Sequence, residues 1–233
     1  MKLKYDLHIH SALSPCADND MTPSSIAGFR LLSGADVISL CDHNSALNTP
    51  FVKKACDEYK IRFIPGIEVN TAEEIHVLCY FSDVDAALEM GEIIYRSLPN
   101  IKIDSEIWGE QLVVNESDEV VGRVEKLLTV ASSLDIYAVK SECERLGGIA
   151  VPAHVDRDSY SVLSVLGFMP DDLGFHAVEM VNPEKYRSFA DKKMLPENVE
   201  VLNSSDAHNL AALINEDLPY LDDDSALMRL LGL

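Results

Sequence analysis

Long hydrophobic runs are missing from this sequence of 233 residues, although 47% of the residues are hydrophobic. No segment approaches the roughly 18 consecutive apolar residues that a membrane-spanning helix needs. From Lys2 onward the chain alternates between polar and apolar residues, and it lacks the apolar stretch of a signal peptide. We therefore expect no membrane association, a cytoplasmic location, and a sizeable buried core.

Cysteine is scarce and irregularly placed. The five cysteines are odd in number, widely spaced and form no CxxC pair; they are Cys16, Cys41, Cys56, Cys79 and Cys143. This usage is typical of free thiols in a reducing compartment. Cys16 stands apart because it lies close to the first pair of histidines.

Basic residues are also few. Lys and Arg number 19 against 39 Asp and Glu, so the formal net charge is −20. Broad DNA-binding surfaces rely on Lys and Arg to neutralise phosphates, so we do not expect long nucleic acids as partners. Bound cations can reverse the field inside a pocket, and a nucleotide or short oligonucleotide therefore stays open as a substrate.

Short apolar runs alternate with helical periodicity along the chain. Strands are predicted at 3–10, 36–41, 62–69, 75–81, 149–153, 177–181 and 199–203, and helices at 24–34, 50–59, 83–96 and 135–146. This alternation predicts an α/β fold with a parallel sheet. Polar residues follow many different strands, and a closed barrel would bring those strand ends into one mouth. We therefore expect a single TIM-like barrel domain over residues 1–233.

The alternation breaks over residues 98–130. Asn100, Asn115 and Gly122 punctuate this segment, which also contains Trp108 and Arg123. We interpret it as an inserted loop or hairpin. A lid over the barrel mouth and a dimer contact are both compatible with it, and the sequence leaves the oligomeric state open.

Six of the seven histidines lie at or near the ends of predicted strands, together with carboxylates. These residues are His8, His10, His43, His76, His154 and His208, with Asp42, Glu68 and Asp206. Two positions apart on a strand, His8 and His10 share one face. Burying so many imidazoles and carboxylates would be costly without compensation, which divalent cations supply. The set therefore predicts a multinuclear metal site.

The same residues resemble the ordered motifs of the PHP (polymerase and histidinol phosphatase) domain. The motifs are Asp6-Leu7-His8-Ile9-His10-Ser11, Cys41-Asp42-His43-Asn44, Gly66-Ile67-Glu68, His76, Pro152-Ala153-His154 and Ser205-Asp206-Ala207-His208. The resemblance spans nearly the whole chain. It implies a distorted (β/α)7 barrel that holds three metal ions at its C-terminal mouth.

The resemblance also implies which residues bind each ion. His8, His10, Glu68 and Asp206 would hold the first ion; Glu68 would bridge to a second, completed by His76 and His154. A third ion would lie between His43 and His208. Family members supply one more ligand from the loop after the first strand, and Asp18 is our choice for it, with Asp20 or Cys16 as alternatives.

Such a site implies hydrolysis. A hydroxide bridging two ions would attack phosphorus, while the third ion clamps phosphate oxygens. Asp206 or His208 would shuttle the proton. Arg157 is placed to bind phosphate through two hydrogen bonds, although a surface ion pair with Asp156 or Asp158 is the alternative.

Four further residues receive supporting roles. Asp42 is expected to orient a histidine ligand. His176 precedes its strand and should lie at the opposite end of the barrel, in a structural role. Glu179 and Asn182 end that strand and can reach the pocket.

Four functions compete at this point. The first is a metal-dependent phosphoesterase acting on a small phosphomonoester. The others are a phosphodiesterase or nuclease, a barrel that has lost its metals, and an amidohydrolase-like enzyme that cleaves a C–N or ester bond. The near-complete ligand set argues against the metal-free barrel. Imidazole and carboxylate accept manganese, iron and zinc alike, so the ligands leave the metal identity open.

Overall fold

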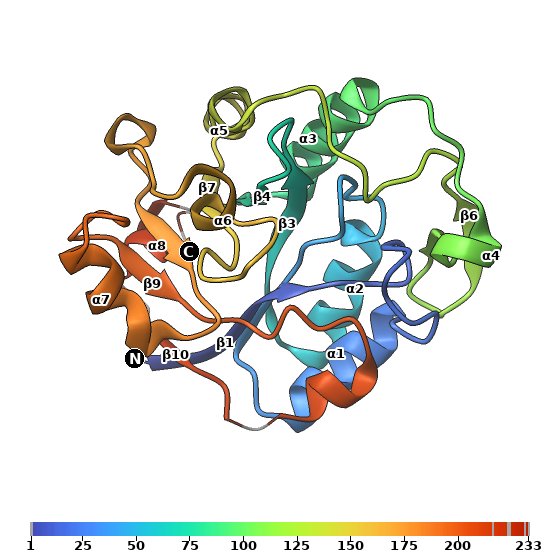
Figure 1. Ribbon diagram of the computed structural model, residues 1–233. Helices are drawn as coiled ribbons and strands as arrows, with labels where there is room; N and C mark the ends of the chain where they lie inside the picture. Colours follow the sequence, from blue (N-terminus) through green and yellow to red (C-terminus); the bar gives the residue numbers. More distant parts are fainter. Residues whose placement is uncertain (1, 216, 223–224, 231, 233) are drawn as a thin grey trace.

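A curled six-stranded sheet forms the centre of the computed structural model, which describes residues 2–215, 217–222, 225–230 and 232. Its strands, in spatial order, are β10 (Tyr220–Asp222), β1 (Lys2–Ile9), β2 (Val37–Leu40), β3 (Arg62–Asn70), β4 (His76–Tyr80) and β7 (Ile149–Pro152). A separate parallel pair, β8 (Ala177–Glu179) and β9 (Glu200–Leu202), continues the curve beyond β7 (Figure 1).

The mixed α/β class agrees with the sequence prediction, but the prediction of an all-parallel sheet is wrong. β1, β2 and β3 are parallel, whereas β4 runs antiparallel to both β3 and β7, and β10 runs antiparallel to β1. Only five residues separate β3 from β4, too few for the crossover that a parallel pair requires. Within the described residues outside the segment 98–130, the strands form two separate sheets, of six and of two strands, where one continuous barrel was expected.

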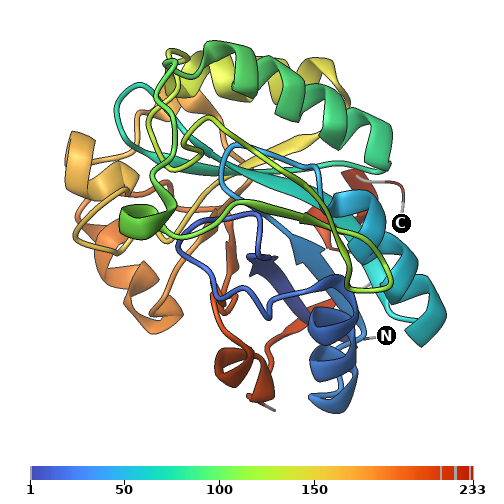
Figure 2. The same ribbon diagram turned by 90° about the vertical axis from the view of Figure 1, so that its right-hand side faces the viewer.

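Helices cover the outer surface of the sheet. They are α1 (Pro23–Leu32), α2 (Thr49–Tyr59), α3 (Val84–Ser97), α5 (Ile136–Arg145), α6 (Val162–Leu166) and α7 (Tyr186–Asp191), whereas α8 (Ala226–Leu230) packs Leu227 and Met228 into the cluster inside the curl. The predicted helices at 24–34, 50–59, 83–96 and 135–146 correspond to α1, α2, α3 and α5. Figure 2 shows α3 and α5 on one side of the strands and α1 and α2 on the other.

Alternating side chains divide the core into layers. On β4, Leu78 and Tyr80 face the inside of the curl, while Val77 and Cys79 pack outward against α3 and α5. A separate cluster, including Ile26 of α1 and Val52 of α2, packs against β2. The curvature is therefore maintained by apolar packing on both faces.

A buried ion pair ties β1 to α1. Arg30 and Asp6 are both fully buried, and the Arg30 guanidinium donates to the Asp6 carboxylate. Asp6 also accepts hydrogen bonds from the backbone N–H and hydroxyl of Ser205. This network fixes the loop that leads from β9 to Asp206.

The segment 98–130 contains α4 (Ser105–Trp108) and an antiparallel pair of strands, β5 (Leu112–Val114) and β6 (Val120–Arg123). It crosses in front of the carboxyl ends of β1 and β2 in Figure 2. Asn48 anchors it, because its amide donates to the Leu112 carbonyl and accepts from the Val114 N–H. The segment thus lies over the edge of the sheet where the polar residues gather.

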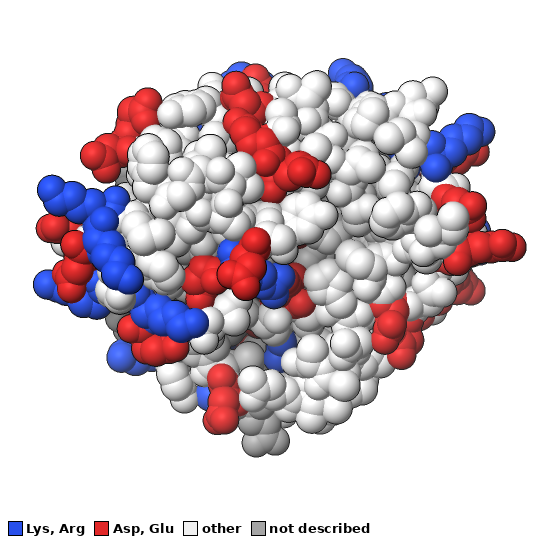
Figure 3. Space-filling view, in the orientation of Figure 1, with Lys and Arg blue, Asp and Glu red and all other residues white. Residues whose placement is uncertain are grey.

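Two properties of the whole chain concern its possible partners: its helices' ability to cross a membrane and the distribution of its surface charge. Among the described residues, no helix combines the length and apolarity that crossing a bilayer demands. On the face drawn in Figure 3, basic side chains gather over α7 at the left edge. The segment 185–193 contributes four exposed basic residues: Lys185, Arg187, Lys192 and Lys193.

Candidate metal centre

The sheet brings the predicted site residues to one edge. They lie at the end of β1 (His8, His10), after β2 (His43), in β3 (Glu68), at the start of β4 (His76), after β7 (His154) and after β9 (Asp206, His208). β4 is antiparallel to its neighbours, so its first residue lies beside their last ones. The sequence placed His76 within its strand, and only the reversed strand direction explains why it reaches this edge.

Glu68 lies at the centre of five imidazole rings. Its Oε1 lies 2.9 Å from His76 Nδ1, 3.3 Å from His154 Nε2 and 3.4 Å from His8 Nε2, and its Oε2 lies 2.9 Å from His43 Nδ1 and 3.5 Å from His10 Nε2. The carboxylate is almost fully buried. A single carboxylate surrounded by several imidazole nitrogens is the arrangement expected when two cations share that carboxylate as a ligand.

Asp206 faces the same cluster from the opposite side. Its Oδ1 lies 3.0 Å from His10 Nε2 and 3.3 Å from His8 Nε2, and its Oδ2 lies 2.6 Å from Arg157 Nη1. The Arg157 side chain is 42% exposed, so it reaches from solvent into the site. Asp156, offered earlier as an ion-pair partner of Arg157, instead accepts hydrogen bonds from Val181 and Asn182.

Polar neighbours fix the orientation of the first two rings. His8 Nδ1 lies 3.0 Å from Glu179, and His10 Nδ1 lies 3.0 Å from the Ser14 hydroxyl, which itself donates to Asp42. If each Nδ1–H donates, each Nε2 presents a lone pair, and these Nε2 atoms lie 3.1 Å apart beside Asp206. Two facing lone pairs favour a cation between them.

Buried atoms without hydrogen-bond partners also favour cations. Among the described side chains, four such atoms belong to this site: Nδ1 of His43, His76 and His154, and Oε2 of Glu68. Two of them approach within 2.9 Å without hydrogen-bond geometry. Unsatisfied buried polar atoms are rare in proteins, and convergent ones fit metal coordination.

Three overlapping groups of side chains could each hold an ion. They are His8, His10 and Glu68; His43, Glu68 and His76; and His10, His43 and His208. Within each group the potential ligand atoms lie within 4.8 Å of one another. The residues therefore fit more than one divalent ion, with Glu68 and the histidines shared between positions.

The electrostatics keep the carboxylates ionised. Burial alone would raise the pKa of Glu68, but the rings of His76, His8 and His43 hold this pKa well below its usual range. The pKa of Asp206 is likewise lowered despite its burial, by His8 and His10. Both carboxylates are thus charged at neutral pH and available to cations.

The loop after β1 brings Cys16 to the imidazoles. Cys16 is exposed at the surface; partial desolvation by the surrounding loop raises the pKa of its thiol, but contacts with the His208 and His43 rings outweigh this effect and lower the pKa to about 7. Asp18 is exposed, and its backbone N–H donates to the His208 carbonyl at 2.8 Å. The other four cysteines are buried free thiols.

Two site residues have strained backbones. His154 has φ of 32° and Asp206 has φ of 49°, which are values that side chains other than glycine rarely adopt. Both lie in loops shortly after a strand, His154 after β7 and Asp206 after β9. Such strain persists only where the surroundings fix it, and it is concentrated at functional sites.

A cavity of about 470 Å³ opens beside the imidazoles. Pro15, Cys16, Glu74, Ile101, Trp108, Leu127, Thr129, Val130, Ala131 and Tyr160 line it. Half of these residues come from the segment 98–130. The Tyr160 ring stacks on that of His76, with centroids 4.7 Å apart. The cavity therefore connects the metal-binding residues to the inserted segment.

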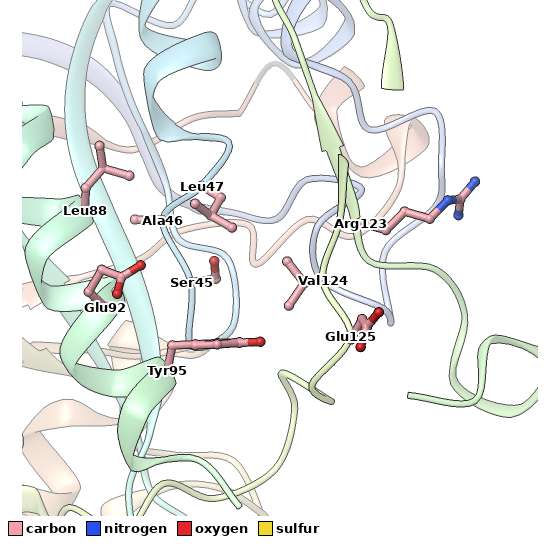
Figure 4. A pocket seen from close by; sticks show the side chains of 10 residues that line it. Ser45, Ala46, Leu47, Leu88, Glu92, Tyr95, Arg123, Val124 and Glu125 are labelled. Carbon is pink, nitrogen blue, oxygen red and sulfur yellow. The ribbon is translucent and has the colours of Figure 1, made fainter. Parts of the chain in front are cut away.

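A second cavity, of about 600 Å³, lies between α3 and residues 123–125 at the end of β6 (Figure 4). Tyr95 reaches into it from α3, while Arg123 points away. None of the six site histidines is among its described lining residues. It begins at Ser45, two residues beyond His43, yet it contains no part of the metal-binding cluster.

Sequence reasoning missed two contributors to the site. Ser14 binds Asp42, His10 and the His43 backbone, and Tyr160 covers His76. Neither carries a pattern in the sequence, because serine and tyrosine in loops are common. Glu179 proves to be a hydrogen-bond partner of His8 and of the His154 backbone. His176 lies away from the site, beside Gly148 at the start of β7.

Comparisons with known proteins identify the fold. No family model matches the chain. An amidohydrolase from Chromobacterium violaceum, solved with bound sulfate and no metal, matches with a TM-score of 0.62 at 18% identity, over 94% of this chain and 91% of that one. A candidate metal-dependent phosphoesterase from Bifidobacterium adolescentis matches with a TM-score of 0.58 at 17% identity, over 88% and 87%.

Two further similarities involve nucleases. A lesion-specific endonuclease from Pyrococcus furiosus matches with a TM-score of 0.63 at 19% identity, over 90% of this chain and 49% of that one. A 5'-3' exoribonuclease from Haemophilus influenzae is 33% identical over 81 residues, which are 34% of this chain. That match covers only 28% of the curated relative's length.

These neighbours show that the chain has a TIM-barrel-like fold. One of them, Endonuclease Q, was solved with a 27-mer DNA duplex that has an abasic lesion at the active site; it matches with a TM-score of 0.60 at 17% identity, over 90% of this chain and 50% of that one. A protein that shares this fold over about half of its length therefore binds long nucleic acid. This finding partly conflicts with our expectation that long nucleic acids are not partners, which rested on the acidic charge and the scarcity of basic residues.

Proposed function

We propose that this protein is a metal-dependent phosphoesterase that holds three divalent ions and hydrolyses a small phosphomonoester. One observation carries the proposal: six imidazoles and two carboxylates from six strands or strand ends converge, and four of their buried atoms have no hydrogen-bond partner among the described residues. Manganese, iron and zinc all suit these donors. When bound, such ions lower the pKa of water to near neutrality and offset phosphate charge.

The chain's own residues divide the remaining tasks. Arg157 is partly exposed at the mouth, and its guanidinium can bind two phosphate oxygens once it leaves Asp206. Of the six site imidazoles His208 is the most exposed, at 27% of its side chain. It is therefore the residue best placed to pass a proton to the leaving oxygen.

The mouth cavity would hold the leaving group. Trp108 and Ile101 are exposed on the inserted segment, and Tyr160 lies opposite against His76. These side chains offer an apolar wall beside a polar site, as small-molecule sites usually do. Segment 98–130 thus acts as a covering wall of the pocket in this proposal.

Metal analysis tests the central claim. Purified protein reconstituted with manganese, iron or zinc should hold two to three ions per chain, and fewer than one would refute the proposal. A panel of sugar phosphates, histidinol phosphate and nucleotides would then rank substrates. The same panel should include phosphodiester and amide substrates. The relative rates of hydrolysis then distinguish a phosphomonoesterase from a phosphodiesterase and from an amidohydrolase.

Two substitutions test the residue roles. His154→Ala and Asp206→Ala should each abolish turnover while the circular dichroism spectrum stays native. His176→Ala is the matched control, because this histidine is exposed and lies at the other end of the strands. Full activity in either site variant would show that the assignment is wrong.

A nucleotide or nucleic acid substrate is the second candidate. The observation that favours it is the aromatic pair at the mouth, Trp108 and Tyr160, because bases stack on such rings at about 1–3 kcal/mol each. The basic segment 185–193 adds positive charge to an otherwise acidic chain. Trp108→Ala should then raise KM for nucleotides more than for sugar phosphates.

A further inference from the structure

The turn formed by residues 14–17, in the loop after β1, is firmly attached to the site. Ala17 N–H donates to the Ser14 carbonyl at 2.9 Å, which closes a turn with Cys16 inside it. The Ser14 hydroxyl accepts from the His43 N–H, and Asp18 N–H donates to the His208 carbonyl. Both ends of the turn are therefore bonded to the backbones of the two histidines that Cys16 contacts.

The Cys16 thiol is the group of this turn that reaches the rings. It makes side-chain contacts with both His43 and His208. Those rings, with His10, form a cluster whose potential ligand atoms lie within 4.8 Å of one another. His43 is buried, and its Nδ1 lacks a hydrogen-bond partner among the described residues. Asp18, by contrast, contacts His208 through its backbone N–H.

We propose that Cys16 supplies a thiolate sulfur to the ion between His43 and His208, making this position a sulfur-containing site that prefers zinc or iron(II) to manganese. The inference rests on the proposed metal centre and specifies the donor that completes it. Thiolate ligands select softer ions, whereas imidazole and carboxylate alone accept manganese readily. The three positions would therefore differ in metal preference, with zinc or iron(II) held at the Cys16 position and manganese accepted at the Glu68 positions.

Cobalt substitution gives a readout that does not depend on turnover. A thiolate ligand produces a near-ultraviolet charge-transfer band on Co²⁺, which imidazole and carboxylate do not. The wild-type protein should show this band, and Cys16→Ser should lose it while the visible d–d bands remain. Cys56→Ala is the control, because this buried α2 thiol lies outside the site and its loss should leave the band intact.

Zinc titration supplies the second measurement. Cys16→Ser should weaken the binding of one zinc ion per chain by at least about tenfold, since losing even an outer partner of a ligand costs that much. Cys16→Asp should restore binding of a third ion but shift its preference toward manganese. Asp18→Ala should leave the stoichiometry unchanged.

The possible results distinguish a failure of the proposed function from a failure of the inference about Cys16. If wild-type protein binds no ion, the proposed function itself fails. If wild-type protein binds its ions but Cys16→Ser keeps the charge-transfer band and the zinc affinity, only this inference is overturned. Loss of one ion in Asp18→Ala but not in Cys16→Ser would assign the ligand to Asp18 instead. Native circular dichroism of Cys16→Ser shows that a lost ion does not result from unfolding.

Discussion

Glu179 shows how one residue can orient a proposed metal ligand without being a ligand itself. Its carboxylate lies 3.0 Å from His8 Nδ1 and also accepts from the His154 N–H. It thereby fixes the ring of one proposed ligand and the strained backbone of another. Carboxylate–histidine pairs of this kind orient the ring and increase its basicity.

We predict that Glu179→Gln lowers metal affinity by about 10–100-fold without abolishing the fold. The amide keeps the shape but carries no charge, so the His8 ring is held less firmly. Isothermal titration of the metal-free protein with zinc measures the effect. Glu184→Gln is the control, since this exposed residue lies in the next turn after β8. Equal affinities in both variants would contradict the role.

At the scale of elements, the inserted segment depends on a glycine where it meets the loop after β1. Gly109 has φ of 90°, and a Cβ added to it would lie 2.2 Å from the Pro15 carbonyl oxygen. Pro15 precedes Cys16, so this contact joins the end of α4 to the turn that reaches the metal centre. Only glycine permits both the positive φ and the close approach.

Gly109→Ala should lower the free energy of unfolding by more than about 2 kcal/mol, because it adds a backbone clash to conformational strain. Gly147→Ala is the matched control. Gly147 also has a positive φ, 75°, but its Cβ would meet nothing within 4 Å. Urea unfolding of both variants separates the cost of backbone strain from the cost of the clash with Pro15. Similar losses of unfolding free energy in the two variants would mean that the Pro15 backbone moves aside at little cost.

Asp156 connects two other elements. It accepts hydrogen bonds from the Val181 and Asn182 N–H groups and from the Asn182 side chain, so it ties the loop after β7 to the end of β8. These bonds outweigh burial and hold the pKa of Asp156 below its usual value. A lowered folded-state pKa stabilises the protein at pH above the unfolded-state pKa near 3.8.

Asp156→Asn should therefore destabilise the protein at neutral pH, and this difference from wild type should shrink as the pH falls below about 4. The reason is that the wild-type carboxyl loses its advantage once it is protonated. Thermal melts of metal-free protein from pH 7 to pH 3 measure the trend. A difference that stays constant over this range would show that the charge does not contribute.

At the scale of the whole molecule, charge sets the limits on polyanionic partners. The chain carries a formal net charge of −20, and four of its 19 basic residues gather in the segment 185–193 (Figure 3). One of them, Arg187, is already paired with Asp191 at 3.2 Å. Any interface with a nucleic acid backbone would therefore be narrow.

We predict that duplex DNA binding, if measured, depends on salt with a logarithmic slope no steeper than about −4, because each neutralised phosphate contributes about −0.9. Lys192→Glu combined with Lys193→Glu should flatten that slope. Fluorescence anisotropy with a 27-mer duplex at several salt concentrations provides the measurement. A steeper slope would reveal a broad basic interface elsewhere on the surface.

Much of this protein can be read from local patterns. The strand and helix positions follow from apolar periodicity, which depends on neighbouring residues alone. The HxH pair and the polar residues after several strands identified a shared site, because strand ends meet at one edge of a sheet. The rings of His8, His10, His43, His76 and His154 surround Glu68, Asp206 lies against His8 and His10, and the His208 ring stacks on that of His10; their role as metal ligands stays a prediction.

The tertiary structure decided what depends on direction and distance. The short connection before β4 reversed that strand and brought His76 to the mouth, against the parallel prediction. Contacts between residues far apart in sequence assigned Glu179 to His8, Arg157 to Asp206 and Cys16 to the His43 and His208 rings. A sequence pattern records which groups are present, but only the folded chain fixes which donor atoms lie close enough to share one cation.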